Sequence, residues 1–191
     1  MKIIFASHNH KKTEEIRALL PAHISLLNLH DLSQTETIPE DEPTIEGNSA
    51  FKANWVYEKY GVPCFADDTG LEVNALDGAP GVHSARYAGE GRSDEANMQK
   101  LQTNLGHATD RSAQFKTVIT FRDKNVTEQF TGLVKGEIAK EAKGTKGFGY
   151  DPIFCPEGLD RSFAEMELTE KNQYSHRARA LSKLIEYLEK R

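Results

Sequence analysis

Short apolar strands alternate with amphipathic helices along the 191-residue chain, and this alternation constrains the fold more than any other feature. Lys2–Ala6 is typical of a buried strand, and a helix is predicted over Lys11–Leu20, where Pro21 ends it. A second helix is predicted over Glu46–Tyr60, with Gly61 just past its end. The first part of the chain therefore indicates an α/β fold, and no internal repeat is present.

The second part of the chain contains an antiparallel hairpin. Phe115–Phe121 and Val126–Ile138 are rich in β-branched and aromatic residues, and they flank a polar turn at residues 123–125. A hairpin beside the strands of an α/β unit predicts a mixed β-sheet. We expect residues 1–191 to form a single α/β domain.

Further strands and helices are predicted around this hairpin. Residues 63–67 and 71–73 are typical of two short strands, and the glycine-rich residues 76–91 indicate an ordered loop. A helix is predicted from the capping residues Ser93 and Asp94 to Leu105. The last helix is predicted from near Ser175 to the end of the chain.

Composition excludes several classes of function. A net charge of −5 argues against a general nucleic-acid binder, which normally carries a surplus of lysine and arginine. Apolar runs such as Ile3–Ala6 are too short to span a membrane, and no secretory segment follows Met1, so we expect a cytoplasmic protein with no membrane partner. Cys64 and Cys155 lack histidine or cysteine neighbours at metal-ligand spacing, which predicts free, buried thiols.

The first candidate for chemistry is the segment Ser7–Lys12 between the first strand and its helix. Unpaired N–H groups at a helix N-terminus, with short hydroxyl and amide side chains beside them, can bind phosphate oxygens. Lys11 and Lys12 lie where the helix dipole favours acidic residues, and a bound polyanion would offset that repulsion. The alternative interpretation, a solvated first turn, is equally consistent with this segment alone.

The second candidate is the segment 64–72, in which an apolar strand leads into Asp67 and Asp68 before Gly70. Acids at a strand end lie where open α/β sheets commonly bind ligands. Neighbouring strand residues face opposite ways, so only one of the two carboxylates should reach a given metal ion. Glu40, in an acidic loop, is a further candidate ligand for Mg²⁺. An aspartate that caps a turn is the simpler explanation of an isolated pair.

The third candidate is the glycine-rich segment 144–154. Its three glycines allow close approach of the backbone to a ligand, and Phe148 and Tyr150 offer flat faces for stacking on a base. Aromatic residues near a strand more often belong to a core.

The fourth candidate is the segment 170–181. Ser175 is a natural N-cap, yet His176 and Arg177 follow in the first helical turn, again against the preference of the dipole. Exposed residues of these types are ordinarily solvated, so this segment is weak by itself.

Together these segments resemble the inosine triphosphate pyrophosphatases, also called dITP/XTP pyrophosphatases. The resemblance spans nearly the whole chain. It rests on Ser-x-Asn-x-x-Lys at 7–12, residues 48–53 with Lys52, the strand segment 65–71, Gly78-Ala79-Pro80-Gly81, Ser84-Ala85-Arg86-Tyr87, residues 147–154 and Ser175-His176-Arg177.

The resemblance implies hydrolysis of ITP, dITP and XTP to the nucleoside monophosphate and pyrophosphate, with Mg²⁺ as cofactor and usually as a homodimer. It implies an elongated mixed β-sheet with two α/β lobes flanking a central cleft. Glu40 and Asp68 would bind the metal, Asp68 would also match the proton acceptor, and Lys52 would contact phosphate. The substrate-binding residues would be Ser7, His8, Asn9, His10, Lys11, Lys12, Thr69, Phe148, Gly149, Tyr150, Asp151, Lys171, His176 and Arg177.

Two positions depart from the family pattern. His8 stands where the family usually has glycine, which would strain the loop if this position needed a positive φ. Gly47 stands where a glutamate often precedes the helical asparagine, so a local interaction at the start of that helix is lost.

Two alternatives to this activity follow from the same residues. A sensor that binds a triphosphate without hydrolysing it would need the lysines and aromatics, but not Glu40, Asp67 and Asp68. A phosphatase would differ only in the phosphorus atom attacked. We place the choice of base on His176, Arg177 and Asp151, because hydrogen-bond donors aimed at position 6 favour a carbonyl over the amino group of adenine.

Overall fold

The computed structural model describes every residue from Met1 to Arg191, and the chain forms two compact units. Unit 1 comprises residues 1–68, 117–132 and 177–191, and unit 2 comprises residues 69–116 and 133–176. Each unit is therefore built from segments that are distant in the sequence. No helix is both long enough and apolar enough to cross a membrane.

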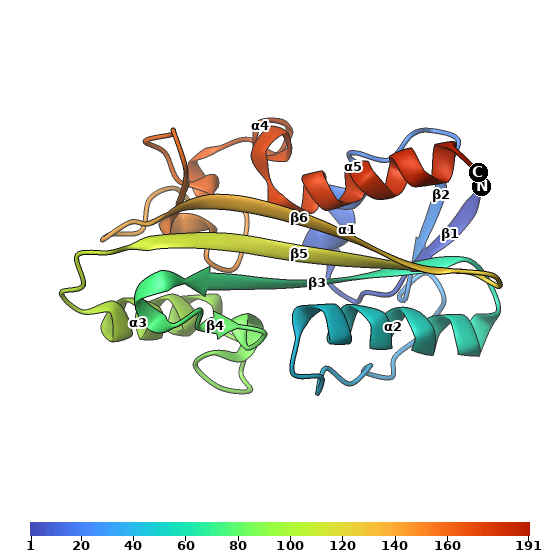
Figure 1. Cartoon of the computed structure of the whole chain (residues 1–191), viewed down its shortest axis with the longest axis horizontal. Coiled ribbons are helices and arrows are strands. Elements are labelled where there is room, and N and C mark those ends of the chain that lie inside the picture. The colour runs from blue at the N-terminus through green and yellow to red at the C-terminus, as the bar shows by residue number, and fades with distance from the viewer. The chain divides into compact units, whose positions relative to one another are not determined.

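The strands form a mixed sheet, as the sequence predicts (Figure 1). They are hydrogen-bonded in the order β2-β1-β3-β5-β6-β7, with β4 paired to β3. Strand β1 runs parallel to β2 and β3, whereas β4 is antiparallel to β3 and β7 is antiparallel to β6. The elements are β1 (Lys2–Phe5), α1 (His10–Arg17), β2 (Ser25–Asn28), α2 (Ile45–Tyr60), β3 (Cys64–Val73), β4 (Pro80–Gly81), α3 (Asp94–Leu105), β5 (Ser112–Arg122), β6 (Thr127–Ile138), β7 (Phe154–Pro156), α4 (Leu168–Tyr174) and α5 (His176–Glu189).

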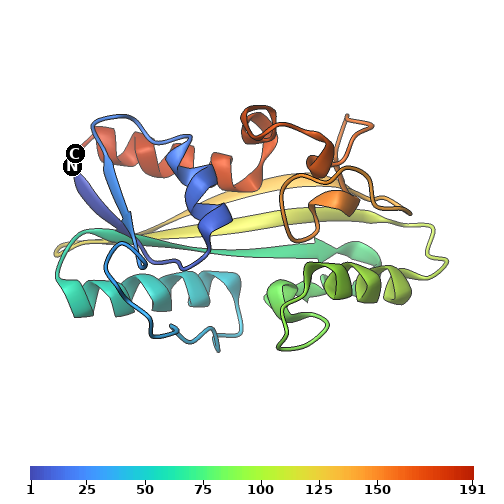
Figure 2. The ribbon, with the colours of Figure 1, turned by 180° about the vertical axis from the view of Figure 1, so that it is seen from behind.

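Unit 1 has a hydrophobic cluster on each face of its strands, because successive strand residues point to opposite faces. Ile3 and Phe5 of β1 pack with residues of α1 and α5, whereas Ile4 of β1 and Ala6, which follows the strand, pack with residues of α2. In β3 the same alternation places Phe65 in the first cluster and Ala66 in the second. Helix α2 thus covers one face, and α1 and α5 cover the other, as both views show (Figures 1 and 2).

Helix α2 begins one residue before the predicted Glu46 and ends at Tyr60, as predicted. The Thr44 side chain accepts a hydrogen bond from the backbone N–H of Gly47, and Gly61 adopts the left-handed conformation at the C-cap. Gly47 has little room for a side chain, since an added Cβ would lie 2.9 Å from Cβ of Glu42. Glycine at this position therefore accompanies a close approach of the preceding loop.

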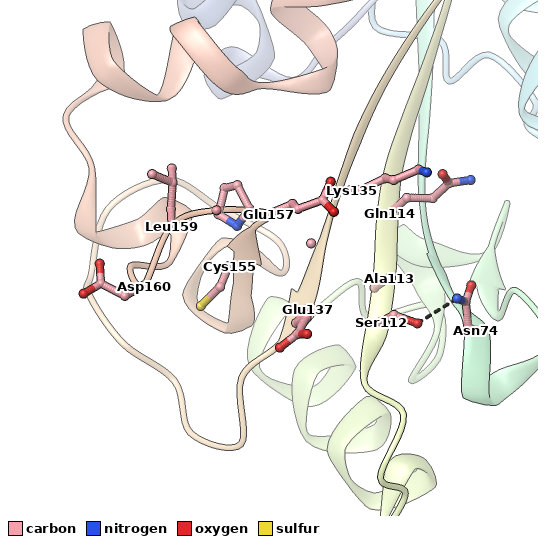
Figure 3. A pocket seen from close by; sticks show the side chains of 13 residues that line it. Asn74, Ser112, Ala113, Gln114, Lys135, Glu137, Cys155, Glu157, Leu159 and Asp160 are labelled. Carbon is pink, nitrogen blue, oxygen red and sulfur yellow. Dashed lines mark hydrogen bonds between the residues drawn. The ribbon is translucent and has the colours of Figure 1, made fainter.

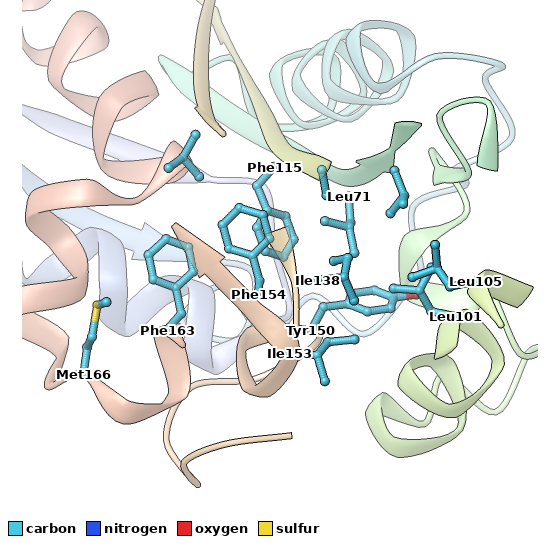
Figure 4. Packing of buried hydrophobic residues seen from close by; sticks show 13 residues of the cluster. Leu71, Leu101, Leu105, Phe115, Ile138, Tyr150, Ile153, Phe154, Phe163 and Met166 are labelled. Carbon is cyan, nitrogen blue, oxygen red and sulfur yellow. The ribbon is translucent and has the colours of Figure 1, made fainter. Parts of the chain in front are cut away.

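Unit 2 has one hydrophobic core (Figure 4). Three phenylalanine rings lie at its centre, with ring centroids of Phe115 and Phe154 4.7 Å apart and those of Phe154 and Phe163 5.4 Å apart. Leu101 and Leu105 of α3 contribute from another element. Burial of aromatic and aliphatic side chains is the main stabilising contribution to such a core.

Several predicted elements are confirmed and some are wrong. The hairpin and the helix after Ser93 are present, but β3 is one continuous strand where two short ones were predicted. Asp67 and Asp68 therefore lie within a strand and not at its end. Strand β2 and helix α4 were missed because β2 has only four residues, and in α4 the sole buried residue is Lys171.

Candidate functional site

A buried lysine between two carboxylates is the central feature of the candidate site in unit 1. Nζ of Lys52 lies 2.8 Å from Oε1 of Glu40 and 2.8 Å from Oδ1 of Asp68. Lys52 is 6% exposed and Asp68 is 7% exposed, so these charges have little access to water. The Coulomb attraction between such buried charges is much stronger than between charges at the surface, and it opposes the cost of removing them from water.

The alternation of β3 determines where its two aspartates point. Asp68 points to the same face of the strand as Ala66, the face covered by α2, and its carboxylate accepts a hydrogen bond from Lys52 of that helix. Asp67 follows Phe65 to the opposite face and meets Lys12 of α1 and Arg177 of α5. Neighbouring carboxylates therefore enter different charge networks, as the period of a strand requires.

Asp67 is the centre of a buried ion-pair network. Its Oδ1 accepts from Nζ of Lys12 at 2.9 Å, and its Oδ2 accepts from Nε of Arg177 at 3.0 Å. Arg177 also donates through Nη1 to Glu15, which is buried on α1. Glu15 was missed by the sequence analysis. The signal available was its position three residues after Lys12, which places both side chains on one face of the helix.

The two aspartates differ in protonation behaviour. Burial raises the pKa of Asp68 above its ordinary value, even though Lys52 and Lys12 oppose this effect. For Asp67, the opposing attraction of Lys12, Arg177 and Lys52 exceeds the effect of burial, and its pKa is lowered. A raised carboxyl pKa is suited to accepting a proton, whereas a lowered one belongs to a permanent anion.

Lys52 and Arg177 remain charged despite their burial. Burial lowers the pKa of Lys52, but Asp68 and then Glu40 and Asp67 outweigh it, and the pKa is raised. Burial likewise opposes the charge of Arg177, yet Glu15 and Asp67 raise its pKa. Both residues thus act as fixed positive charges inside unit 1.

The segment Ser7–Lys12 opens helix α1. Asn9 is the N-cap, and its side chain accepts a hydrogen bond from the backbone N–H of Lys12. The Ser7 hydroxyl accepts from the backbone N–H of Asn9 at 3.1 Å. The first turn contains no acidic residue, as the sequence indicates. His8 is not among the three non-glycine residues with positive φ, so its backbone carries no strain of that kind.

In unit 2, Asp151 holds the glycine-rich segment in place. Its Oδ2 accepts from the backbone N–H of Phe148 at 2.9 Å and from Nζ of Lys171 at 2.6 Å. Gly147 has a φ of +72°, and an added Cβ would lie 2.1 Å from Oδ2 of Asp151. Glycine is therefore required there both by its backbone conformation and by the approach of this carboxylate.

Lys171 and Asp94 complete the surroundings of this segment. Nζ of Lys171 lies 5.1 Å from the centroid of the Phe148 ring, within the range of a cation–π contact. Asp94, at the start of α3, accepts from the backbone N–H of Gly149 at 2.8 Å. From the sequence, Asp94 is predicted only to cap the helix that follows it. Its link to Gly149 joins segments that are 55 residues apart.

The other predicted aromatic and basic residues are more buried than the sequence suggested. The Tyr150 ring is 4% exposed within the core, and its hydroxyl donates to the backbone oxygen of Ser84 at 2.9 Å. His176 is 3% exposed, with its ring centroid 4.6 Å from that of Phe115. Phe148 is half-buried. Thr69 is also half-buried.

A cavity of about 700 Å³ lies elsewhere in unit 2 (Figure 3). Its walls come from β5, β6, β7 and the turn after β7, and they include Lys135, Glu137 and Cys155. None of the predicted site residues lines it. Both cysteines are free as predicted, although Cys155 is half-buried and only Cys64 is fully buried. Burial raises the pKa of the Cys64 thiol to about 12.

Glu40 and Asp68 fit a divalent cation by their chemistry. Each has an oxygen 2.8 Å from Nζ of Lys52, so the two carboxylates lie on either side of one position, which the lysine cation occupies in this structure. Mg²⁺ takes oxygen ligands and commonly uses only one or two carboxylates, together with water and substrate phosphates. No three histidine, cysteine or acidic side chains form a larger metal-binding group. Two carboxylates suit an ion that is bound together with its substrate.

Fold and site together define a mixed-sheet α/β protein with a buried lysine–carboxylate centre. A sequence profile of the Ham1 family matches residues 3–187. The dITP/XTP pyrophosphatases of Christiangramia forsetii and Porphyromonas gingivalis are 55% and 50% identical to the chain, over 190 and 188 residues. The alignments cover 100% of both chains for the first, and 98% of this chain and 97% of the relative for the second.

Solved structures give the same assignment. The Ham1 protein of Staphylococcus aureus superposes with a TM-score of 0.90 at 40% identity, covering 99% of this chain and 98% of that one. A HAM1 protein from Coxiella burnetii gives a TM-score of 0.91 at 37% identity, with 100% coverage of both chains. The chain belongs to the Ham1 family, which confirms the resemblance inferred from its motifs.

Proposed function

We propose that this protein hydrolyses the non-standard purine nucleoside triphosphates ITP, dITP and XTP to the nucleoside monophosphate and pyrophosphate. The observation that carries this proposal is the buried Lys52 between Glu40 and Asp68. Of these two acids, Asp68 has a pKa that burial raises. The full-length relatives are named dITP/XTP pyrophosphatases, which supports dITP and XTP as substrates. Such an activity removes deaminated purines from the nucleotide pool.

The chemical step requires attack of water on the α-phosphorus. A bond forms between the water oxygen and the α-phosphorus, the bond from that phosphorus to the bridging oxygen breaks, and pyrophosphate leaves. Asp68 accepts the proton of the water, a role to which its raised pKa is suited. Lys52 stabilises the negative charge that develops on the phosphate oxygens. Mg²⁺, held by Glu40 and Asp68, would supply further charge stabilisation.

Substrate binding is divided between two groups of residues in this proposal. In unit 1, Ser7, Asn9 and the first turn of α1 bind the phosphates through hydroxyl, amide and backbone N–H groups. In unit 2, Phe148 offers a partly exposed ring for the base, and Lys171 and Asp151 fix the conformation of that segment. The positive charges of Lys11 and Lys12 favour the polyanion.

Identifying the phosphate product tests this function against its alternatives. Incubation with ITP and Mg²⁺ should yield IMP and pyrophosphate, which ³¹P NMR distinguishes from IDP and orthophosphate. Orthophosphate as the first product would make the protein a phosphatase, and binding without turnover would make it a sensor. Removal of divalent metal with EDTA should abolish turnover, and added Mg²⁺ should restore it. Full activity after exhaustive chelation would contradict the roles of Glu40 and Asp68 as metal ligands.

We further propose that the active form is a homodimer with a two-fold interface, which uses the same patch on both subunits. The support is the family resemblance together with the acidic, non-membrane character of the chain. Light scattering at working concentration should give twice the mass of 21.4 kDa. A monomer mass under those conditions would refute this proposal.

A further inference from the structure

Three histidines lie together in unit 1: His8 and His10 of the segment Ser7–Lys12, and His30 next to them. The ring of His30, in the loop after β2, stacks on His10, with centroids 4.4 Å apart and an angle of 9° between the planes. The same ring meets His8 edge-on, with centroids 5.3 Å apart and an angle of 81°. His30 is exposed and was not predicted to take part in any site. It is thus the common neighbour of two residues in the proposed phosphate-binding segment.

Hydrogen bonds add directional contacts to these rings. Nε2 of His30 lies 3.0 Å from the backbone oxygen of His8, and because a carbonyl can only accept, the imidazole donates. In the same way, Nε2 of His8 donates to the backbone oxygen of Gln34 at 2.7 Å. Two hydrogen bonds therefore join the segment to the loop after β2: the backbone oxygen of His8 accepts one, and the His8 side chain donates the other.

This loop is itself anchored in unit 1. Gln34 is 7% exposed, and its side-chain oxygen accepts from the hydroxyl of Tyr60 at 3.1 Å. Its backbone N–H donates to the oxygen of Leu29, which is completely buried. The histidines thus connect the exposed start of α1 to a fixed part of the fold. A loop that is rigid before the ligand arrives loses less conformational entropy on binding.

We propose that His30 is a positioning residue that holds the segment Ser7–Lys12 ready for the triphosphate of the substrate. This inference rests on the proposed function, because it assigns the phosphates to that segment. His30 acts through the backbone of His8 and the ring of His10. Fixing the segment matters because Lys11 and Lys12 place cations at a helix N-terminus, where the helix dipole disfavours them.

Replacement of His30 by alanine should raise KM for ITP while kcat stays within about twofold. Loss of one net hydrogen bond and a ring contact corresponds to a KM increase of roughly 3- to 10-fold. His23→Ala is the matched control, since it removes another exposed histidine of unit 1 that lies outside this cluster. Urea unfolding of both variants distinguishes a positioning role from a loss of stability. We expect the decrease in the free energy of unfolding to be small and equal in the two variants.

Two conservative variants separate the hydrogen bond from the ring contact. His30→Gln retains a donor that can reach the oxygen of His8 but lacks a ring, whereas His30→Phe retains the ring but has no donor. Each should reverse part of the increase in KM that His30→Ala causes. The effects of His30→Ala and His10→Ala on KM should be less than additive, since both changes remove the same stacked pair.

A direct measurement of phosphate binding tests the same role of His30 without relying on turnover. Isothermal titration with inorganic tripolyphosphate and Mg²⁺ should show weaker binding to His30→Ala than to His23→Ala. If the wild-type protein releases pyrophosphate and the two variants have equal KM and equal tripolyphosphate affinity, the positioning role is refuted and the proposed function stands. If the wild-type protein releases no pyrophosphate from ITP, the proposed function fails and the titration still tests the role of His30.

Discussion

Exchange of each neighbouring aspartate for asparagine should separate stability from activity. Asp67 is 1% exposed and pairs with Lys12 and Arg177, so Asp67→Asn leaves two buried or half-buried cations short of an anion. Removing one partner of a buried ion pair costs about 3–5 kcal/mol of the free energy of unfolding. Arg177 retains Glu15, and the Lys12 side chain is 16% exposed, so we expect the lower end, about 3 kcal/mol. For a chain of this size that corresponds to a Tm lowered by roughly 6–12 °C.

The expected effect of Asp68→Asn is the reverse. Burial already disfavours the charged form of Asp68, and Lys52 retains Glu40, so the free energy of unfolding should change by less than about 1.5 kcal/mol. Loss of a proton acceptor together with a metal ligand should lower kcat by roughly 1,000-fold. Asp67→Asn, measured at a temperature at which it is folded, should lose less activity than this.

Two assays decide between these expectations. Urea unfolding followed by circular dichroism gives the stability of each variant, and pyrophosphate release from ITP gives turnover. Near-normal turnover in folded Asp68→Asn would show that Asp68 is neither the proton acceptor nor a required metal ligand. An Asp68→Asn protein that is less stable than Asp67→Asn would contradict the division of the two carboxylates into a reactive and a structural one.

Two further predictions concern Tyr150 and Arg177. Burial, with a smaller contribution from Tyr87 and Asp94, raises the pKa of Tyr150, so the folded protein holds this proton more tightly than an unfolded chain whose tyrosine pKa is about 10. The stability that this proton contributes is complete below about pH 10 and is lost as the pH rises towards the folded-state pKa. Between pH 8 and 11, the free energy of unfolding of Tyr150→Phe should therefore fall less than that of the wild type. Equal decreases in the two proteins would count against this linkage. Arg177→Ala should lower the ratio of kcat/KM for ITP over ATP, mainly through ITP, and an unchanged ratio in the folded variant would assign base recognition to other residues.

The sequence predicts much of unit 1 because local rules agree there. Thr44 and Gly61 bound α2 as caps, and the period of a strand separates Asp67 from Asp68. The continuation of β3 beyond Asp68 was not predictable from local signals. The sequence predicts separate strands at 63–67 and 71–73, whereas β3 continues through Gly70, and Leu71 and Val73 are completely buried in it.

Contacts between distant segments account for the rest of what was missed. The pairing of Lys52 with Glu40 depends on the path of an irregular loop, which no periodicity describes. His176 was expected to be solvated unless functional, but its ring packs on Phe115 in the core. Likewise, Tyr150 was considered as a stacking surface for a base, and the long-range bond of its hydroxyl to Ser84 places it in the core.

Hydrolysis of ITP in water enriched in ¹⁸O tests the central claim most directly, because pyrophosphate release alone does not identify the phosphorus that is attacked. Attack on the α-phosphorus, as Lys52 and Asp68 are proposed to promote, places the label in IMP and leaves pyrophosphate unlabelled. Mass spectrometry of both products distinguishes this result from attack on the β-phosphorus. One ¹⁸O atom in IMP and none in pyrophosphate is the predicted result, and label in pyrophosphate with unlabelled IMP would contradict the mechanism.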